Sequence, residues 1–315
     1  MIDLRLGYLV FGVRDLPAWR EFCGGMLGLP APLENSDGSI GWAIDEAAQR
    51  LIAREDGRDD IAAVGLDCGT ADGLAATLSR LHDAKTAVRR ASAELRRARR
   101  VQDLYVTEDA DGNSVELFRG LERAEAPFRS DAFAAGFRTG EAGMGHAVLV
   151  SRDLEAMERF YVGVLGFGVT ERLQTQVGPI GIRGVFLHCN RRHHSLALFD
   201  LPSTKRLHHF MLQANAHMDV GLALERARAR RVPLSLDLGQ HPAPDGTFSF
   251  YGVTPSGFDF EIGAGSGEIA PQQWQEVRTQ KTSSWGHRPQ WRLKWRMAAA
   301  MLGQWLRGRQ EAAPT

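Results

Sequence analysis

The amino-acid sequence is a duplication, and this limits the folds that the chain can adopt. A segment that begins at Gly7 returns at Gly145 with the same order of glycine, aspartate and apolar residues. The recurring residues are Gly7, Arg14, Asp15, Leu16, Phe22, Leu27 and Gly28 in the first copy and Gly145, Arg152, Asp153, Leu154, Phe160, Leu165 and Gly166 in the second. We therefore expect both halves of the chain to fold in the same way.

Local patterns repeat again within each half. In each copy a run rich in β-formers is followed by an aspartate that can cap a helix, Asp15 or Asp153. Further strand-like runs follow, and the whole pattern occurs four times, with later helices expected over residues 72–82 and 219–230. The sequence thus predicts an α+β fold of four βαβββ modules.

A single module of this kind exposes one face of a curved sheet that it cannot bury alone. Two modules can curl their sheets around a shared cavity, in which a small ligand would lie. We therefore expect two open, β-barrel-like domains, at residues 1–135 and 136–287, and a basic, tryptophan-rich tail at residues 288–315.

The composition narrows the class of partner. The formal net charge of the 315 residues is +0, so overall charge gives no reason to expect a nucleic-acid partner. Cys23, Cys68 and Cys189 form no Cys-x-x-Cys pair, which argues against a thiolate zinc site and favours reduced thiols in the cytoplasm. The sequence shows no signal-peptide pattern and no apolar run of about 20 residues.

The two halves differ in residues that can bind a metal. In the second half, His146, His209 and Glu261 lie in strand-like runs. The equivalent places in the first half hold Tyr8, approximately Ala63, and Glu116. A lone histidine in an apolar strand is usually structural, but here both histidines are missing together while the strand pattern survives. Two histidines and one carboxylate suit a ferrous ion with open coordination positions, so the second half is predicted to carry the chemistry.

Longer motifs in the second half make a family resemblance specific. They are Gly145-His146, Asn190–Ala197, His208–Leu212, Gly239–His241 and Phe250–Glu261. Through them the chain resembles the type I extradiol ring-cleavage dioxygenases of the vicinal oxygen chelate superfamily, such as dihydroxybiphenyl and catechol 2,3-dioxygenases. The resemblance covers roughly residues 4–287 and implies the vicinal oxygen chelate fold, with a non-catalytic first half and a catalytic second half.

The resemblance also implies an activity. His146, His209 and Glu261 would bind Fe(II), with Mn(II) as the less favoured metal. The substrates would be O₂ and a hydrophobic catechol, such as a biphenyl, fused-ring or steroid-derived diol, whose ring opens beside the diol during degradation of aromatic compounds. Two rival functions stay open, namely another metalloenzyme of the superfamily, such as a glyoxalase or epimerase, and a non-enzymatic protein that sequesters a small molecule.

A turn rich in arginine and histidine supplies the acid–base candidate. By resemblance, His194 points into the oxygen-binding pocket and handles protons there. The alternative from the residues alone is a solvated hairpin tip, which we expect for His193. His208 precedes the expected ligand His209, and neighbours on a strand face opposite ways, so His208 is expected to face away from the metal in a structural or supporting role.

Residues around the third strand of the last module would contact the substrate. By resemblance, His241 and Tyr251 hydrogen-bond to the catechol oxygens, and Asp245, Phe248 and Thr254 lie close by. The alternatives from the residues alone are a loop histidine and a core aromatic residue. The loop after His241 is one residue longer than the family pattern, which leaves the role of Asp245 open.

Two basic segments are expected to lie outside the site. The run Arg96–Arg100 has no interleaved aromatic residues and predicts a solvated face. In the tail, Trp291, Trp295 and Trp305 recur at helical spacing. This tail is predicted to form a helix that docks on the catalytic domain or on another subunit of a homo-oligomer, and weak contact with a membrane surface is the alternative.

Overall fold

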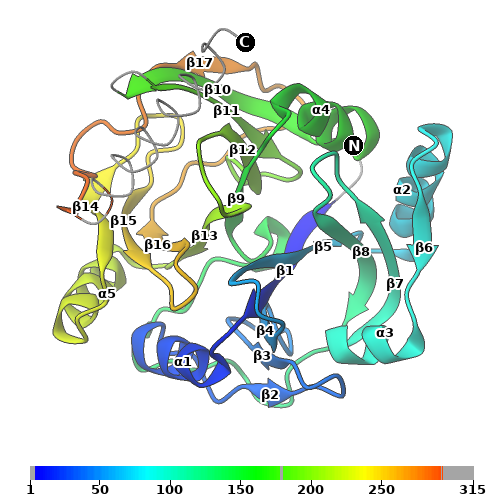
Figure 1. Ribbon diagram of the computed structural model, residues 1–315, viewed down its shortest axis with the longest axis horizontal. Helices are drawn as coiled ribbons and strands as arrows, with labels where there is room; N and C mark the ends of the chain where they lie inside the picture. The colour runs from blue at the N-terminus through cyan, green and yellow to red at the C-terminus, as the bar shows by residue number, and fades with distance from the viewer. Residues whose placement is uncertain (1–3, 178–179, 292, 294–315) are drawn as a thin grey trace, which may run out of the picture.

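The chain forms two mixed β-sheets with a few short helices on their outer faces, as the computed structural model of residues 4–177, 180–291 and 293 shows (Figure 1). The first sheet has the strand order β2-β3-β4-β1-β5-β8-β7-β6 and the second has the order β14-β15-β16-β13-β9-β12-β11-β10-β17. Both are open sheets, curled but not closed into barrels.

The first sheet is built from β1 (Arg5–Val13), β2 (Leu33–Glu34), β3 (Ile40–Trp42), β4 (Leu51–Glu55), β5 (Asp60–Asp67), β6 (Val88–Arg90), β7 (Val101–Glu108) and β8 (Ser114–Leu121). The second is built from β9 (His146–Val150), β10 (Gly168–Val177), β11 (Ile180–His188), β12 (Leu196–Asp200), β13 (Leu207–Gln213), β14 (Leu234–Gln240), β15 (Phe248–Val253), β16 (Asp259–Ala264) and β17 (Val277–Thr279). The helices are α1 (Leu16–Glu21), α2 (Ala71–Asp83), α3 (Ala93–Arg99), α4 (Leu154–Glu158) and α5 (His217–Ala229), with the short turns η1 (Phe22–Met26), η2 (Gly140–Ala142) and η3 (Arg159–Val164).

The duplicated helix start is confirmed in both halves. The side chain of Asp15 accepts a hydrogen bond from the Ala18 amide at 2.8 Å, and that of Asp153 accepts one from the Ala156 amide at 2.9 Å. Each carboxylate thereby satisfies an amide that has no partner within the helix. Both helices then widen into a π-helical turn, η1 or η3, which the sequence pattern did not predict.

Strand register places the metal-binding candidates and their counterparts in one-to-one correspondence. In the second sheet His146 pairs with Met211, and Met211 pairs with Glu261. In the first sheet Tyr8 pairs with Gly65, and Gly65 pairs with Glu116. The remaining pairs are His209 with Val148 in one half and Ala63 with Val10 in the other. The predicted equivalence of Tyr8, Ala63 and Glu116 with His146, His209 and Glu261 is therefore confirmed.

An ion pair fills the first half at the place equivalent to the metal-binding candidates. Tyr8 donates its hydroxyl to Glu116 Oε2 at 2.5 Å, and Arg99 Nε donates to the same oxygen at 2.9 Å. Arg99 is only 3% exposed, so the prediction that the run Arg96–Arg100 is a solvated face is wrong for this residue. The run lies largely in α3, a helix that was not predicted, and the buried Glu116 carboxylate needs the guanidinium as its counter-charge.

The two halves share one hydrophobic core. The ring of Phe11 in β1 lies 5.3 Å from that of Phe210 in β13 and 5.4 Å from that of Phe258 beside β16. Trp19 in α1 donates its indole N–H to Ser256 Oγ at 2.9 Å. The exact boundary between the halves stays a prediction, since β8 ends at Leu121 and β9 begins at His146.

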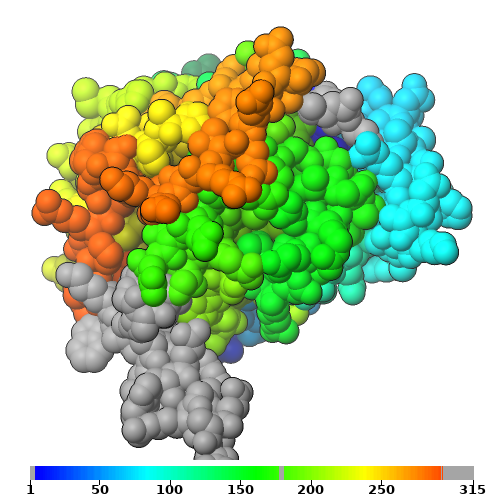
Figure 2. Space-filling model, turned by 90° about the horizontal axis from the view of Figure 1, so that it is seen from above, coloured from blue at the N-terminus to red at the C-terminus, as the bar shows by residue number. Residues whose placement is uncertain are grey.

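A segment after β16 crosses the outer surface of the second half, where it is drawn in orange (Figure 2). It contains β17, which pairs in parallel with β10 and was not predicted. Isolated bridges then join Gln240 to Trp285 and Leu236 to Pro289. Trp291, near the start of the predicted tail helix, is 65% exposed. Most of that helix would fall on residues 292 and 294–315, which lie outside the described residues. Among the helices that are described, none is long and apolar enough to span a bilayer.

Candidate active site

The three predicted metal ligands meet on adjacent strands of the second sheet. His146 opens β9, His209 lies in β13, and Glu261 lies in β16. The two Nε2 atoms are 3.2 Å apart, and Glu261 Oε2 lies 3.2 Å from Nε2 of His146 and 3.4 Å from Nε2 of His209. All three side chains are buried, and their ligand atoms face one another.

This triangle of atoms fits a single divalent metal ion. An ion about 2.1 Å from each atom separates its ligands by about 3.0 Å at right angles and about 3.4 Å at tetrahedral angles. The observed separations lie between these values. In the described part of the chain, neither oxygen of the buried Glu261 carboxylate has a hydrogen-bond partner, a costly arrangement unless a cation binds there.

The electrostatics of the triad favour the protonation states of metal ligands. Burial lowers the pKa of His146. Burial alone would raise the pKa of Glu261, but the facing rings of His146, His209 and His241 hold it well below its usual value. A neutral imidazole and an ionised carboxylate are the forms that bind a metal.

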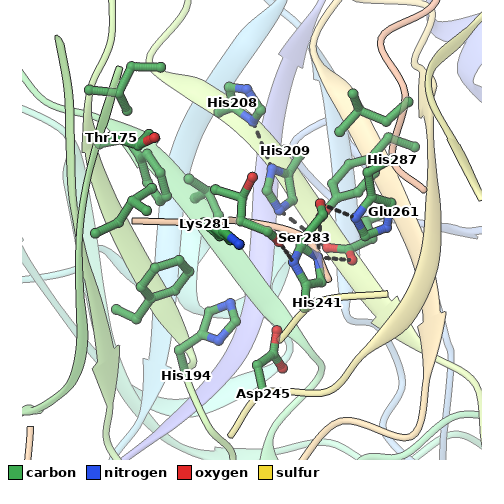
Figure 3. Close-up of a pocket in the computed structure, with 18 of the residues that line it drawn as sticks. Thr175, His194, His208, His209, His241, Asp245, Glu261, Lys281, Ser283 and His287 are labelled. Carbon is green, nitrogen blue, oxygen red and sulfur yellow. Dashed lines mark hydrogen bonds and ion pairs between the residues drawn. The ribbon is translucent and has the colours of Figure 1, made fainter. Parts of the chain in front are cut away.

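A cavity of ≈ 290 Å³ opens in front of the triad (Figure 3). Most of its wall away from the triad is apolar. The apolar lining includes Val148, Leu173, Ile182, Phe186, Phe199 and Leu236. Its rim carries Lys281, Thr282 and Ser283, which belong to the segment after β17.

His241 and Tyr251 lie together on one side of the triad. His241 follows β14 and Tyr251 lies in β15, and His241 Nε2 is 2.9 Å from the Tyr251 hydroxyl. His241 Nδ1 donates to the carbonyl oxygen of Thr282 at 2.5 Å, which leaves Nε2 facing the cavity. Burial would lower the pKa of His241, but the carboxylates of Glu261 and Asp245 raise it to about 9. Burial raises the pKa of Tyr251 well above its usual range, so its phenol stays protonated.

His194 lies on another side of the cavity, after β11. Its ring centroid is 4.1 Å from that of His146 and 5.0 Å from that of Phe186. Burial, together with the neighbouring His146 and His193, lowers the pKa of His194 well below its usual value. The predicted placement of His194 in the pocket agrees with this geometry, and its catalytic role stays a prediction.

The sequence suggested that His193 lies on a solvated hairpin tip, and this expectation is wrong. His193 is 1% exposed and also lines the cavity. The turn is folded onto the protein because Arg192 is buried and its guanidinium donates to Gln213 Oε1 and to the carbonyl oxygens of Ala142 and Arg138. Among Arg191, Arg192, His193 and His194, only Arg191 is exposed.

His208 lines the cavity as well, although strict alternation along the strand placed it on the opposite face. Leu207 pairs with Leu149 and His209 with Val148, so His208 is the extra residue of a β-bulge. Its Nδ1 lies 2.7 Å from Nδ1 of His209. If His209 donates this hydrogen bond, its Nε2 keeps the lone pair that a metal needs, which is a supporting role of the predicted kind.

Of three further residues expected near the substrate, one lines the cavity and two do not. Asp245 is buried, lines the cavity and accepts a hydrogen bond from Thr247 Oγ1 at 2.6 Å. Phe248 does not line the cavity, because it lies on the face of β15 opposite to Tyr251 and its ring packs 6.2 Å from that of Trp285. Thr254 also lies outside the cavity.

The position of Thr254 has a structural cause. Its amide and its hydroxyl both donate to the carbonyl oxygen of Phe258, at 2.9 and 2.7 Å, and so close the turn between β15 and β16. Phe248 and Thr254 therefore do not line the cavity, and a supporting role for them around the substrate site stays a prediction.

His287 is a cavity residue that no sequence pattern predicted. It lines the cavity, its ring centroid lies 4.6 Å from that of His241, and Ser283 Oγ lies 2.8 Å from its Nδ1. Burial lowers the pKa of His287 to about 4, which keeps it neutral. No periodic pattern surrounds this residue, since it follows Gly286 in an irregular segment, so the sequence contained no signal that could place it.

Comparison with known proteins agrees with this geometry. The model of the Glyoxalase/Bleomycin resistance protein/Dioxygenase superfamily matches residues 143–262, and that of Dihydroxybiphenyl dioxygenase BphC D1 matches residues 6–55. The chain is 39% identical over 286 residues to a 3-methylcatechol 2,3-dioxygenase of Pseudomonas putida, covering 90% of this chain and 97% of the relative. It is 34% identical over 295 residues to an iron-dependent extradiol dioxygenase of Rhodococcus jostii, covering 90% and 96%.

Solved structures show the same relationship. A crystal structure of catechol 2,3-dioxygenase superposes with a TM-score of 0.83 at 30% sequence identity, covering 91% of this chain and 95% of that one. The predicted vicinal oxygen chelate fold is thereby confirmed. The sequence identity over nearly the whole chain and the shared fold, together with the converging candidate ligands, show the family. This protein belongs to the extradiol dioxygenase family of the Glyoxalase/Bleomycin resistance protein/Dioxygenase superfamily.

Proposed function

We propose that the protein cleaves the ring of a hydrophobic catechol with O₂ at a single Fe(II) held by His146, His209 and Glu261. The observation that carries the proposal is the convergence of three ligand atoms, separated by 3.2, 3.2 and 3.4 Å, at the end of one apolar cavity. In this reaction the carbon–carbon bond beside the diol breaks and both atoms of O₂ enter the product, so no external reductant is required.

Fe(II) in this position would supply Lewis acidity and redox chemistry, and the protein residues would handle the protons. With Nδ1 donating to Thr282 and its pKa raised to about 9, His241 would also be protonated at Nε2 and would donate a hydrogen bond from it to a catechol oxygen. The Tyr251 hydroxyl, which burial keeps protonated, can donate a hydrogen bond to a catechol oxygen. These two groups therefore favour a substrate bound as an anion.

His194 would serve the oxygen side of the reaction. Its ring is packed between His146 and Phe186 in a part of the cavity that excludes bulk water. A neutral imidazole in this place can take a proton at one ring nitrogen and return it to the product as the ring opens. Asp245 lines the same region and would help to set the local charge.

The cavity wall supports a hydrophobic substrate. Leu173, Ile182 and Leu236 lie beyond the triad, where an aryl or alkyl substituent of the catechol would extend. We infer that the substrate is a substituted catechol derived from an aromatic compound rather than plain catechol. Imidazole ligands suit iron better than the harder Mn(II), so Fe(II) is the proposed metal.

The ligand count speaks against the rival functions. A glyoxalase or epimerase of this superfamily would use a fourth protein ligand. In the described residues, the group around His146 that could hold one ion contains three ligands. A sequestering protein would need neither the triad nor the hydrogen-bonded pair of His241 and Tyr251.

The proposal is tested by loading the full-length chain with Fe(II) without oxygen, adding 2,3-dihydroxybiphenyl and then admitting air. We expect a yellow ring-cleavage product, and no product from a His146→Ala variant treated in the same way. Parallel loading with Mn(II) compares the two metals. If the iron-loaded chain consumed no O₂ with any of a panel of substituted catechols, the proposal would be wrong.

A further inference from the structure

A second acid–histidine pair lines the cavity, apart from the groups that the proposed function uses. Glu171 in β10 is 5% exposed and His193 is 1% exposed, and both line the cavity. Glu171 Oε2 lies 3.5 Å from His193 Nε2, which is an ion-pair distance and not a hydrogen bond. A buried carboxylate is costly without a partner, and in the described part of the chain His193 is the ionisable group that faces it.

A β-bulge in β10 adjoins this pair. Val169 pairs with Leu187 and Glu171 pairs with Phe186, which leaves Thr170 as the extra residue. Bulges change the direction of neighbouring side chains and are frequent beside active sites. Glu171 follows the bulge and lies in the cavity wall, on the same strand face as Leu173.

The same bulge fixes His193. Thr170 Oγ1 donates to the carbonyl oxygen of His193 at 2.6 Å, and the carbonyl oxygen of Thr170 accepts the indole N–H of Trp274 at 3.0 Å. The Trp274 ring also meets the His193 ring edge to face, with centroids 6.4 Å apart. Since Glu171 and the anchor of His193 come from adjacent residues, the geometry of the pair is set locally.

The pair determines which nitrogen of His194 carries a proton. An ionised carboxylate only accepts, so His193 Nε2 must be protonated to face Glu171 favourably. The Nδ1 atom of a neutral His193 then has a lone pair, and it lies 3.0 Å from Nδ1 of His194. His194 must therefore donate from Nδ1, which leaves the lone pair of its Nε2 free.

We propose that Glu171 and His193 are positioning residues, which hold His194 with its proton on Nδ1 and with an unprotonated Nε2 in the cavity. Figure 3 shows His194 across the cavity from His209 and Glu261, beside Asp245. Without the contacts from Glu171 to His193 and from His193 to His194, His194 could carry its proton on Nε2 and could not accept another there. The use of this tautomer in catalysis rests on the proposed function, whereas the position of the proton on His194 does not.

The tautomer can be measured directly. We suggest recording ¹⁵N spectra of histidine side chains in the full-length chain loaded with diamagnetic Zn(II), with His194 assigned by comparison with His194→Asn. The wild-type chain should show a protonated Nδ1 and an unprotonated Nε2 at His194. Glu171→Met, which keeps the length but loses the acceptor, should yield a mixture of tautomers, whereas Glu171→Gln should retain the wild-type pattern.

Kinetics of the iron-loaded chain supply the second readout. Residues that orient a functional group through a hydrogen bond typically change activity by about 10- to 100-fold. Glu171→Met and His193→Phe should lower kcat by this factor with little change in KM, while Glu171→Gln should stay within about threefold. Gln174→Met, at an exposed position of the same strand, is the matched control and should also stay within about threefold.

Clear outcomes would overturn the proposal. It is wrong if Glu171→Met and His193→Phe leave the His194 tautomer unchanged, or if Glu171→Gln is as damaging as Glu171→Met. Using two variants on opposite sides of the contact keeps the test decisive if one of them does not fold. Absence of ring cleavage in the wild-type chain would count against the proposed function alone, because the ¹⁵N spectra still decide the tautomer.

Discussion

Glu261 and Glu116 occupy the same position in the two halves but have different partners. Glu261 faces two histidine nitrogens, while Glu116 accepts hydrogen bonds from Tyr8 and Arg99. Both carboxylates are buried, so each requires positive charge. In one half this charge comes from the chain itself, and in the other half it is left for a metal ion.

The two equivalent carboxylates, Glu261 and Glu116, permit a matched test of the proposed metal site. Glu261→Gln should lower iron binding and ring cleavage by more than about 10-fold, since a charged ligand is lost. Glu116→Gln removes the same charge from the same place in the other half and should bind iron normally. Iron content after anaerobic loading and desalting measures the difference, and equal losses in both variants would contradict the assignment.

The ion pair of the first half should matter for stability instead. Arg99→Met leaves the buried Glu116 without its counter-charge and should lower the free energy of unfolding by about 3–5 kcal/mol. Arg97→Met, on the exposed side of the same helix, is the control and should have little effect. The double variant Arg99→Met with Glu116→Leu should regain much of the loss in urea unfolding, because no uncompensated charge then stays buried.

At the scale of single elements, two β-bulges adjust the site. One in β13 brings His208 to the cavity beside His209, and one in β10 leaves Thr170 as an extra residue that anchors His193. Strict alternation along β13 would have placed His208 on the opposite face. Such irregularities depend on pairing with neighbouring strands, which a single strand pattern does not reveal.

The bulge in β13 yields a prediction about metal affinity. His208→Ala removes the partner of His209 Nδ1, so His209 is no longer held with its Nε2 lone pair toward the metal. We expect iron affinity to fall by about 10- to 100-fold while the fold is retained. Competition with a chelator measures the affinity, and Thr175→Val, elsewhere in the cavity wall, should leave it unchanged.

His188 at the end of β11 predicts a dependence of stability on pH. Burial lowers its pKa to about 4, with a further contribution from the neighbouring His193. Its ring is held by Thr170 Oγ1 at 2.7 Å. Since the unfolded chain binds a proton at this residue near pH 6.5, its contribution to stability is complete above that pH and declines as the pH falls toward 4.

Urea unfolding at pH 7 and pH 5 tests this sign. The wild-type chain should lose stability at the lower pH, and His188→Asn, which keeps a donor for Thr170 but does not titrate, should lose less. An identical loss in both chains would show that His188 does not contribute to the acid sensitivity.

At the scale of the whole molecule, the basic tail yields a prediction about docking. No acidic residue occurs between Arg288 and Arg309, and Pro289 and Leu293 still line the cavity. We expect the tail to dock on protein, so the full-length chain should not sediment with anionic liposomes at low salt. A chain that ends at Leu293 should keep its iron and its kcat. Sedimentation that this truncation abolished would instead establish contact with a membrane surface.

The amino-acid sequence alone determined the duplicated α+β architecture, the equivalence of Tyr8 with His146 and the choice of three candidate metal ligands. These features follow from local periodicity and from comparison of the two halves, and both are properties of sequence order. Only the tertiary structure decided that Arg99 pairs with Glu116 at the corresponding place in the first half, that Phe248 and Thr254 lie outside the cavity, and that His193, His208 and His287 line it. Those positions depend on bulges, on buried charge pairing and on an irregular segment that crosses from elsewhere in the chain, and such contacts form only when distant strands are brought together.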